Sequence, residues 1–216
     1  MILAAGRGER MMPLTKNTPK PLIKVKGAAL IEHSINALKK ANITNLVINI
    51  AYLGAQLKAH LGDGSSFGVN IQYSDESTSA LETAGGIIKA LPLLGNEPFI
   101  VINSDVLCDY DLSQLTLPKN ALAHLLLIDN PAHNLAGDFS LVGSQITLIQ
   151  QRSLTFSGVG IYHPDFFKAH AHSQSKLALY PLLVDAINSR QLSGEYYAGS
   201  WQDIGTPERL ELANKL

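Results

Sequence analysis

Residues 1–22 read MILAAGRGERMMPLTKNTPKPL and carry the most specific pattern in the chain. A short apolar run, residues 1–5, breaks into a turn that contains Gly6 and Gly8. Glycine tolerates backbone angles that bring amide N–H groups close to an anion, so a strand that ends in such a loop can cradle phosphate groups. Four cations lie in the same stretch, namely Arg7, Arg10, Lys16 and Lys20. The stretch therefore predicts a pre-organised triphosphate site.

Two better-known phosphate motifs do not fit this loop. It lacks the G-x-x-x-x-G-K-[ST] string of the P-loop, and it lacks the third glycine and the immediate helix of the dinucleotide fingerprint. Glycine-rich, arginine-containing turns are also common on protein surfaces. Composition alone leaves the surface turn and the phosphate site equally open.

Beyond the loop, apolar runs of strand length alternate with segments of helical periodicity, which predicts βαβ units and a largely parallel sheet. We expect helices at 30–41, 53–61 and 82–91, the last ending at Pro92, and strands at 45–50, 69–73 and 98–102. After residue 121 successive strands with short turns predict a mixed or antiparallel extension, with strands at 121–128, 139–142, 145–149, 155–162 and 194–198. Two further helices are expected, at 176–189 with Pro181 in its first turn or at a kink, and at 207–216, opened by Thr206 and Pro207.

Length and composition set broad limits. The 216 residues fit one α/β domain over 1–216, and with 46% hydrophobic residues a large core is expected. The net charge of −1 gives no electrostatic footprint for nucleic acid or for an anionic membrane surface. A single cysteine, Cys108, excludes an intrachain disulfide and a multi-cysteine zinc site. Without a signal sequence or a long apolar run, these features predict a cytoplasmic protein.

Two aspartates are candidate catalytic residues. Asp105 follows the expected strand 98–102, at the carboxyl end where open α/β sheets bind their ligands. Asp203 lies in the string WQDIGTP, residues 201–207. Aspartates in such places are also common turn formers and helix caps, so the residues alone leave both readings open.

The opening stretch resembles the signature of the sugar-1-phosphate nucleotidyltransferases, L-x-x-G-x-G-x-R-x-x-P-x-T followed by P-K-P-L. The chain carries it as Leu3, Gly6, Gly8, Arg10, Pro13, Thr15 and residues 19–22. The resemblance implies a Rossmann-like, GT-A-like three-layer α/β sandwich with a mixed, mainly parallel central sheet, here without the C-terminal β-helix of some members. It also implies an enzyme that joins a nucleoside triphosphate to a sugar 1-phosphate and releases pyrophosphate.

The resemblance also implies roles for individual residues. Asp105 and Asp203 correspond to the family's Mg²⁺ ligands. Lys20 is expected to contact the sugar phosphate or the α-phosphate as a point charge, and Arg10, assisted by Arg7, to grip the departing phosphates. Lys16 is expected to be a solvated surface residue. The expected nucleotide-binding residues are Leu3, Ala4, Ala5, Gly6, Arg7, Gly8, Glu82, Gly85 and Gly86.

The acceptor half of the chain carries less specific strings. Asp138, Ser157 and Gly158 fall where the family binds the sugar. Residues 150–153, QQRS, replace the acidic E-K-P string of better-known members, so an ordinary hexose phosphate is not the expected acceptor. Residues 81–86, LETAGG, lack the glutamine common in uridylyl- and thymidylyltransferases. With the short chain, these strings are most similar to the family's N-acetylmuramate-1-phosphate uridylyltransferases of bacterial cell-wall recycling.

We therefore expect a Mg²⁺-dependent enzyme that uses UTP and a sugar 1-phosphate, as a monomer or weak dimer without nucleic-acid or membrane partners. A mannose-1-phosphate guanylyltransferase-like activity, or transfer of CMP to a small phosphorylated alcohol, is the alternative within the enzymes. A non-catalytic nucleotide-sugar sensor is the alternative of another class, although a sensor needs no pair of metal carboxylates. The histidines show no zinc-site spacing, and His170 and His172 are expected in a surface loop, with binding of a stray metal ion as the alternative. His133 is expected to be a loop residue near the acceptor, with a ligand contact as the alternative.

Overall fold

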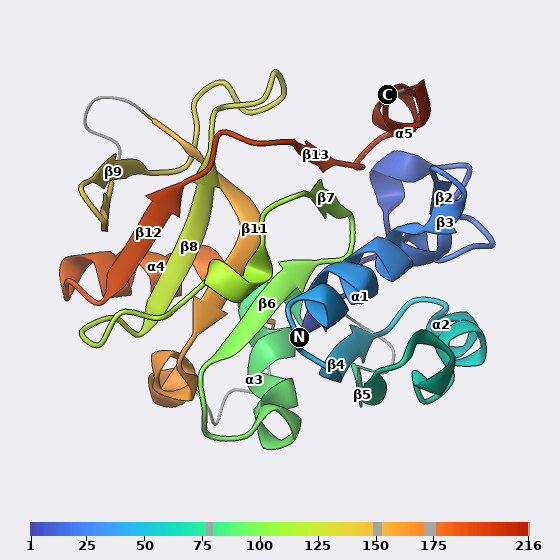
Figure 1. Ribbon diagram of the computed structural model, residues 1–216, viewed down its shortest axis with the longest axis horizontal. Coiled ribbons are helices and arrows are strands. Elements are labelled where there is room, and N and C mark those ends of the chain that lie inside the picture. The colour runs from blue at the N-terminus through green and yellow to red at the C-terminus, as the bar shows by residue number, and fades with distance from the viewer. Residues whose placement is uncertain (77–79, 149–152, 171–175, 216) are drawn as a thin grey trace.

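The computed structural model describes residues 1–76, 80–148, 153–170 and 176–215. Within them a nine-stranded sheet forms the centre of the molecule (Figure 1). Its strands, in chain order, are β1 (Ile2–Leu3), β4 (Asn45–Ile50), β5 (Asn70–Asp75), β6 (Phe99–Asn103), β8 (Ala123–Ile128), β9 (Ser140–Val142), β10 (Gln145–Thr147), β11 (Thr155–Tyr162) and β12 (Leu192–Tyr196). Their order across the sheet is β5-β4-β1-β6-β11-β8-β12-β10-β9.

The sheet has a parallel half and a mixed half. β1 pairs in parallel with β4 and β6, and β4 pairs in parallel with β5. β11 then runs antiparallel to both β6 and β8, while β12 returns parallel to β8. The predicted parallel core with a mixed extension is therefore confirmed. The short strand β1 lies in the middle of the parallel half, which places the loop after it at the carboxyl ends of several strands.

Helices cover both faces of this sheet and make three layers. One face packs against α1 (Leu30–Lys40) and α2 (Gly54–Leu61), through buried residues such as Ile35, Leu38 and Leu57. The other packs against α3 (Glu82–Leu94) and α4 (Leu179–Asn188), through residues such as Ile87 and Leu183. Figure 1 shows α1 in front of the strands and α4 behind β8 and β12. Apolar runs without strict alternation form the central strands because both faces are buried.

Two helix boundaries differ from the sequence prediction. α3 continues past Pro92 to Leu94, and Gly95, at φ 82°, ends it by donating its N–H to the Leu91 carbonyl. Proline in a last turn removes one hydrogen bond without ending the helix, so the predicted stop at Pro92 was wrong. α4 begins at Leu179 rather than at residue 176, and Pro181 lies in its first turn as expected.

The C-terminal segment contributes a strand that was not predicted. β13 (Trp201–Asp203) pairs antiparallel with β7 (Val106–Cys108), the segment that follows β6. After it, α5 (Pro207–Lys215) begins at Pro207, and Thr206 Oγ1 accepts the N–H of Arg209 at 3.4 Å, as the sequence predicted. Figure 1 shows α5 beside the small hairpin of β2 (Lys24–Val25) and β3 (Ala28–Ala29). The pairing of β13 with β7 places residues 201–203 near the carboxyl end of β6.

Some of the expectations concern residues that lie wholly or partly outside those described. These are the end of the expected strand 145–149, the QQRS string, His172 and residue 216. Among the described residues, no helix has both the length and the apolar character needed to cross a membrane.

Candidate active site

A cavity of about 530 Å³ opens at the carboxyl ends of the parallel strands. The loop after β1 supplies one wall, and residues at or beyond the ends of β4, β5 and β6 supply others. The residues that line it are Leu3, Ala4, Ala5, Gly6, Arg7, Gly8, Glu9, Arg10, Lys20, Pro21, Asn49, Glu76, Ala80, Glu82, Thr83, Asn103, Ser104, Asp105 and Gly205. The cavity therefore lies at the edge where open α/β sheets bind ligands.

The loop after β1 is folded back on the segment that carries Lys20. Gly8 has φ 67°, and a Cβ there would lie 3.0 Å from Lys20 Cβ and 3.1 Å from Thr15 Cγ2. The buried Thr15 donates its hydroxyl hydrogen to the Gly8 carbonyl at 2.9 Å. A glycine is required at residue 8 both for the left-handed backbone and for this close approach. The glycine-containing turn at Gly8 and the segment that carries Lys20 are thus packed together as one structural unit.

Lys20 and Asp105 form an ion pair inside the cavity. The ammonium of Lys20 donates a hydrogen bond to Asp105 Oδ2, and only 12% and 25% of the two side chains are exposed. Asp105 lies two residues after the last residue of β6, and the Ile204 N–H donates a hydrogen bond to its carbonyl at 2.8 Å. The cation and the carboxylate are consequently fixed next to the predicted phosphate loop.

Asp203 reaches the same region from the end of β13. In the β13–β7 ladder it stands opposite Val106, one register step from Asp105. Asp203 itself does not line the cavity, whereas Gly205 does, and a Cβ at Gly205 would lie 3.0 Å from Asp203 Oδ2. Asp203 Oδ1 accepts a hydrogen bond from Arg209 Nη1 at 2.6 Å. The second candidate carboxylate is therefore adjacent to the cavity and already has a cationic partner.

A buried chain of hydrogen bonds supports the opposite wall. The Ala4 N–H donates to Asn49 Oδ1, Asn49 Nδ2 donates to Glu76 Oε1, and the Leu81 N–H donates to Glu76 Oε2, each at 2.7 Å. Asn49 and Glu76 are 3% and 4% exposed, and both line the cavity. A buried carboxylate is costly unless it is hydrogen-bonded, and Glu76 accepts both of these bonds. Through Asn49 and Glu76 the loop after β1 is thereby connected to Leu81, at the start of α3. Sequence reasoning missed both residues.

Most of the expected nucleotide-binding residues line the cavity, from Leu3 to Gly8 together with Glu82. Gly85 and Gly86 do not, because they are buried inside α3 behind the wall. A Cβ at Gly86 would lie 2.5 Å from Glu76 Oε1, so this glycine makes room for the buried carboxylate. Among the expected cations, Arg10 lines the cavity, Arg7 lies 5.5 Å from the Tyr52 ring centre, and Lys16 is exposed.

The three expected sugar-binding residues do not line this cavity. Asp138 accepts hydrogen bonds from the Phe156 N–H at 2.8 Å and from Asn134 Nδ2 at 3.1 Å. Ser157 is 1% exposed, and its hydroxyl accepts the Val159 N–H at 3.1 Å.

Gly158 is the member of this group that touches a cavity residue. It has φ 81°, and a Cβ there would lie 2.5 Å from Asn103 Nδ2. In these contacts Asp138 joins the turn at Asn134 to β11, the Ser157 hydroxyl bonds within β11, and Gly158 leaves room for the Asn103 side chain.

The donor set fits the magnesium ion that the sequence signature implies. Carboxylate oxygens from two neighbouring strand ends lie beside a cavity with the volume and the cations for a triphosphate, and Mg²⁺ favours one or two carboxylates plus phosphate oxygens. Within the described ranges no three His, Cys, Asp or Glu side chains cluster where a metal could bind. Any metal here would therefore need further oxygen ligands from phosphate groups or water.

Comparison with known families agrees with this geometry. A family model described as nucleotidyl transferase matches residues 1–216. An N-acetylmuramate alpha-1-phosphate uridylyltransferase from Neisseria meningitidis serogroup B is 50% identical, over 100% of this chain and 96% of its own length. A mannose-1-phosphate guanyltransferase from Gibberella zeae is 38% identical over 96% of this chain, which covers 61% of that protein.

Solved structures share the fold at lower identity. A protein from Bacillus anthracis, provisionally named a glucose-1-phosphate thymidylyltransferase and solved with sucrose, has a TM-score of 0.85 at 24% identity and covers 99% of this chain and 92% of its own. The inositol-1-phosphate CTP transferase from T. maritima has a TM-score of 0.77 at 18% identity and covers 99% of this chain and 94% of its own. At these identities the structures support the three-layer fold alone.

Proposed function

We propose a specific uridylyl-transfer reaction for this chain, which belongs to the nucleotidyl transferase family. The reaction joins UTP to N-acetylmuramate 1-phosphate, yields UDP-N-acetylmuramate and pyrophosphate, and depends on Mg²⁺. Such a reaction belongs to cell-wall recycling in the cytoplasm. The observation that carries the choice of substrates is the 50% identity, over the full chain, to a relative named for uridylyl transfer to N-acetylmuramate alpha-1-phosphate.

The arrangement of charges supports nucleotidyl transfer. In such a reaction a phosphate oxygen of the acceptor forms a bond to the α-phosphorus of UTP while the bond to the departing pyrophosphate breaks. The protein has to align the two substrates and neutralise charge, and it needs no covalent intermediate. Lys20 lies at the cavity beside Asp105, where its ammonium can hold the α-phosphate or the acceptor phosphate. We assign the β- and γ-phosphates to Arg10 and the loop amides, and this assignment is supported by their place in the lining of the cavity.

We assign the magnesium ion to Asp105 and Asp203. When bound, the ion would neutralise phosphate charge and so favour departure of pyrophosphate. The residues of the chain bind and orient: Asn49 and Glu76 keep the Ala4 amide in position, and Gly8 allows Lys20 to approach the loop.

A substrate grid tests the proposal. Pyrophosphate release is measured with UTP, GTP, CTP and dTTP, each against N-acetylmuramate 1-phosphate, mannose 1-phosphate, glucose 1-phosphate and a phosphorylated alcohol, with and without Mg²⁺. We expect UTP with the muramate ester to be the best pair and Asp105→Ala to abolish turnover. GTP with mannose 1-phosphate is the second candidate, because mannose-1-phosphate guanyltransferases match 96% of this chain. No turnover with any pair would favour the non-catalytic sensor.

A further inference from the structure

The Asp203 carboxylate is paired with the guanidinium of Arg209 from α5. Nη1 of Arg209 lies 2.6 Å from Asp203 Oδ1, and only 20% and 17% of the two side chains are exposed. An exposed ion pair contributes little, but a pair this shielded from water interacts more strongly. Arg209 was not among the site residues expected from the sequence.

Neighbouring residues hold Arg209 in this position. The two ring nitrogens of His133 each lie 2.9 Å from Arg209 Nη1, and His133 Nε2 lies 3.2 Å from Asp203 Oδ1. A Cβ at Gly205 would lie 2.1 Å from Arg209 Nη2, so a glycine is needed for the guanidinium to lie there. The cation is therefore enclosed by β13, by α5 and by the loop that carries His133.

That loop is itself fixed. Asn130 donates hydrogen bonds to the Leu135 carbonyl at 3.1 Å and to Ser153 Oγ at 2.8 Å. Asn134 donates to Asp138 Oδ1 at 3.1 Å. These hydrogen bonds fix the turn that places His133 next to Arg209.

Each candidate metal carboxylate has its own cation. Asp105 is paired with Lys20 and Asp203 with Arg209, so the four groups carry no net charge. No third carboxylate joins them among the residues that the structure describes. A divalent cation gains little from such a neutral set, and the guanidinium repels it. A bound triphosphate changes the balance, since it adds several negative charges and further oxygen ligands.

We propose that Arg209 is a positioning counter-ion that keeps Asp203 from binding a divalent cation until the nucleotide is present. The inference rests on the proposed function, in which Asp203 is a metal ligand. Its consequence is that metal and triphosphate bind together, and that the nucleotide-free protein has low affinity for either Mg²⁺ or Mn²⁺.

A purely structural role for Arg209 is the competing explanation. In that case the ion pair would only attach α5 to β13. Other contacts already attach α5, since Ala213 is fully buried in a cluster with Met11 and Ile204, and the Lys26 N–H donates to Asn214 Oδ1 at 2.8 Å. The structural role predicts a loss of stability without a change in metal binding.

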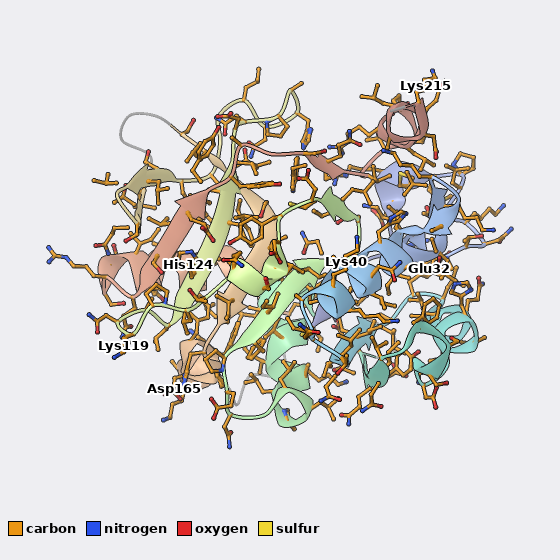
Figure 2. The ribbon with its side chains drawn as sticks, in the orientation of Figure 1. Glu32, Lys40, Lys119, His124, Asp165 and Lys215 are labelled. Carbon is orange, nitrogen blue, oxygen red and sulfur yellow. The ribbon has the colours of Figure 1, made fainter. Side chains whose placement is uncertain are left out.

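Mn²⁺ binding to the nucleotide-free protein, measured by electron paramagnetic resonance, separates the two. Arg209→Met should tighten Mn²⁺ binding by about tenfold or more, because the repelling charge is gone. Arg209→Lys should stay within about twofold of the parent. The matched control is Lys215→Met, which removes a cation from the far end of the same helix (Figure 2). There Lys215 pairs with Glu211, and both side chains are exposed.

The double variant Asp203→Asn/Arg209→Met should lose the gain, which assigns the effect to the Asp203 carboxylate. If Arg209→Met does not fold, Arg209→Gln gives the same comparison. Mn²⁺ binding within twofold of the parent, or weaker, in the folded neutral variants overturns the inference. Turnover retained in Asp203→Asn would instead remove Asp203 from the site and refute that part of the proposed function.

Discussion

Truncation of Glu76 tests whether the buried chain of hydrogen bonds beside the cavity is a structural support of the site. Glu76→Ala removes the acceptor of two hydrogen bonds, from Asn49 Nδ2 and from the Leu81 N–H, each 2.7 Å long. Hydrogen bonds to a charged group contribute about 1.5–3 kcal/mol each, so the loss is about 3–6 kcal/mol before compensation. Removing a buried carboxylate returns part of its desolvation cost. We expect a net loss of about 3 kcal/mol, a large share of a typical total of about 5–15 kcal/mol.

Urea unfolding followed by circular dichroism measures this loss by linear extrapolation. Glu76→Gln should cost less, about 1–2 kcal/mol, because one oxygen remains and the new amide faces a donor. Glu97→Ala is the matched control, since Glu97 is exposed in the loop before β6, and a change within about 0.5 kcal/mol is expected. UTP affinity should fall in Glu76→Ala but not in Glu97→Ala, because the hydrogen bonds through Asn49 and Glu76 hold Ala4 and the start of α3 at the cavity. A Glu76→Ala protein within about 1 kcal/mol of the parent would refute the reasoning.

Three further outcomes are expected. Lys20→Ala should lower turnover by about a hundredfold or more with the fold intact, measured as pyrophosphate release, and a change of only a few-fold would remove Lys20 from the catalytic machinery. Gly158→Ala should destabilise the protein and raise the KM for UTP, because its Cβ would lie 2.5 Å from Asn103 Nδ2 at a backbone φ of 81°. Burial lowers the pKa of His124 below its ordinary 6.5, partly opposed by Glu195, so the unfolded chain binds a proton that the folded chain does not. Stability should therefore decline as the pH falls below 6.5 and be retained above it, and His124→Gln should flatten this dependence in unfolding measurements at two pH values; an unchanged slope would contradict it.

The parallel half of the sheet and the loop after β1 were predictable because their signals are local. A buried strand such as 45–50 is a continuous apolar run, and the loop is a continuous string with two glycines. The rule that selected Asp105 is that polar residues at the carboxyl end of an apolar strand face the ligand. Applied to every strand, that rule would also have selected Asn49, near the end of β4, and Glu76, directly after β5.

The surroundings of Asp203 could not be predicted in the same way. β7 and β13 are three residues long, too short for a period of two to be recognised, and their pairing joins Val106 to Asp203 across the sequence. His133 and Arg209 meet only because the turn after β8 and the first turn of α5 lie side by side. Residues 138 and 157 were expected to bind sugar because of their strings, and the structure gives Asp138 a hydrogen bond to the Phe156 N–H and Ser157 one to the Val159 N–H, with neither residue lining the cavity. A motif locates a segment, and only tertiary contacts decide which of its side chains face the cavity.

The two ion pairs at the cavity bear on the choice between an enzyme and a sensor. Replacing a partly buried ion pair by apolar side chains of similar size is often neutral or stabilising, so stability alone does not account for Asp203 and Arg209. The free energy of unfolding of the double variant Asp203→Leu/Arg209→Met, measured in urea, should accordingly lie within about 1–2 kcal/mol of that of the parent. It should nevertheless release no pyrophosphate, since the proposed metal carboxylate is gone. Full turnover in this variant would show that the reaction does not need the Asp203 carboxylate, and a large loss of stability with turnover retained would make Asp203 a structural residue.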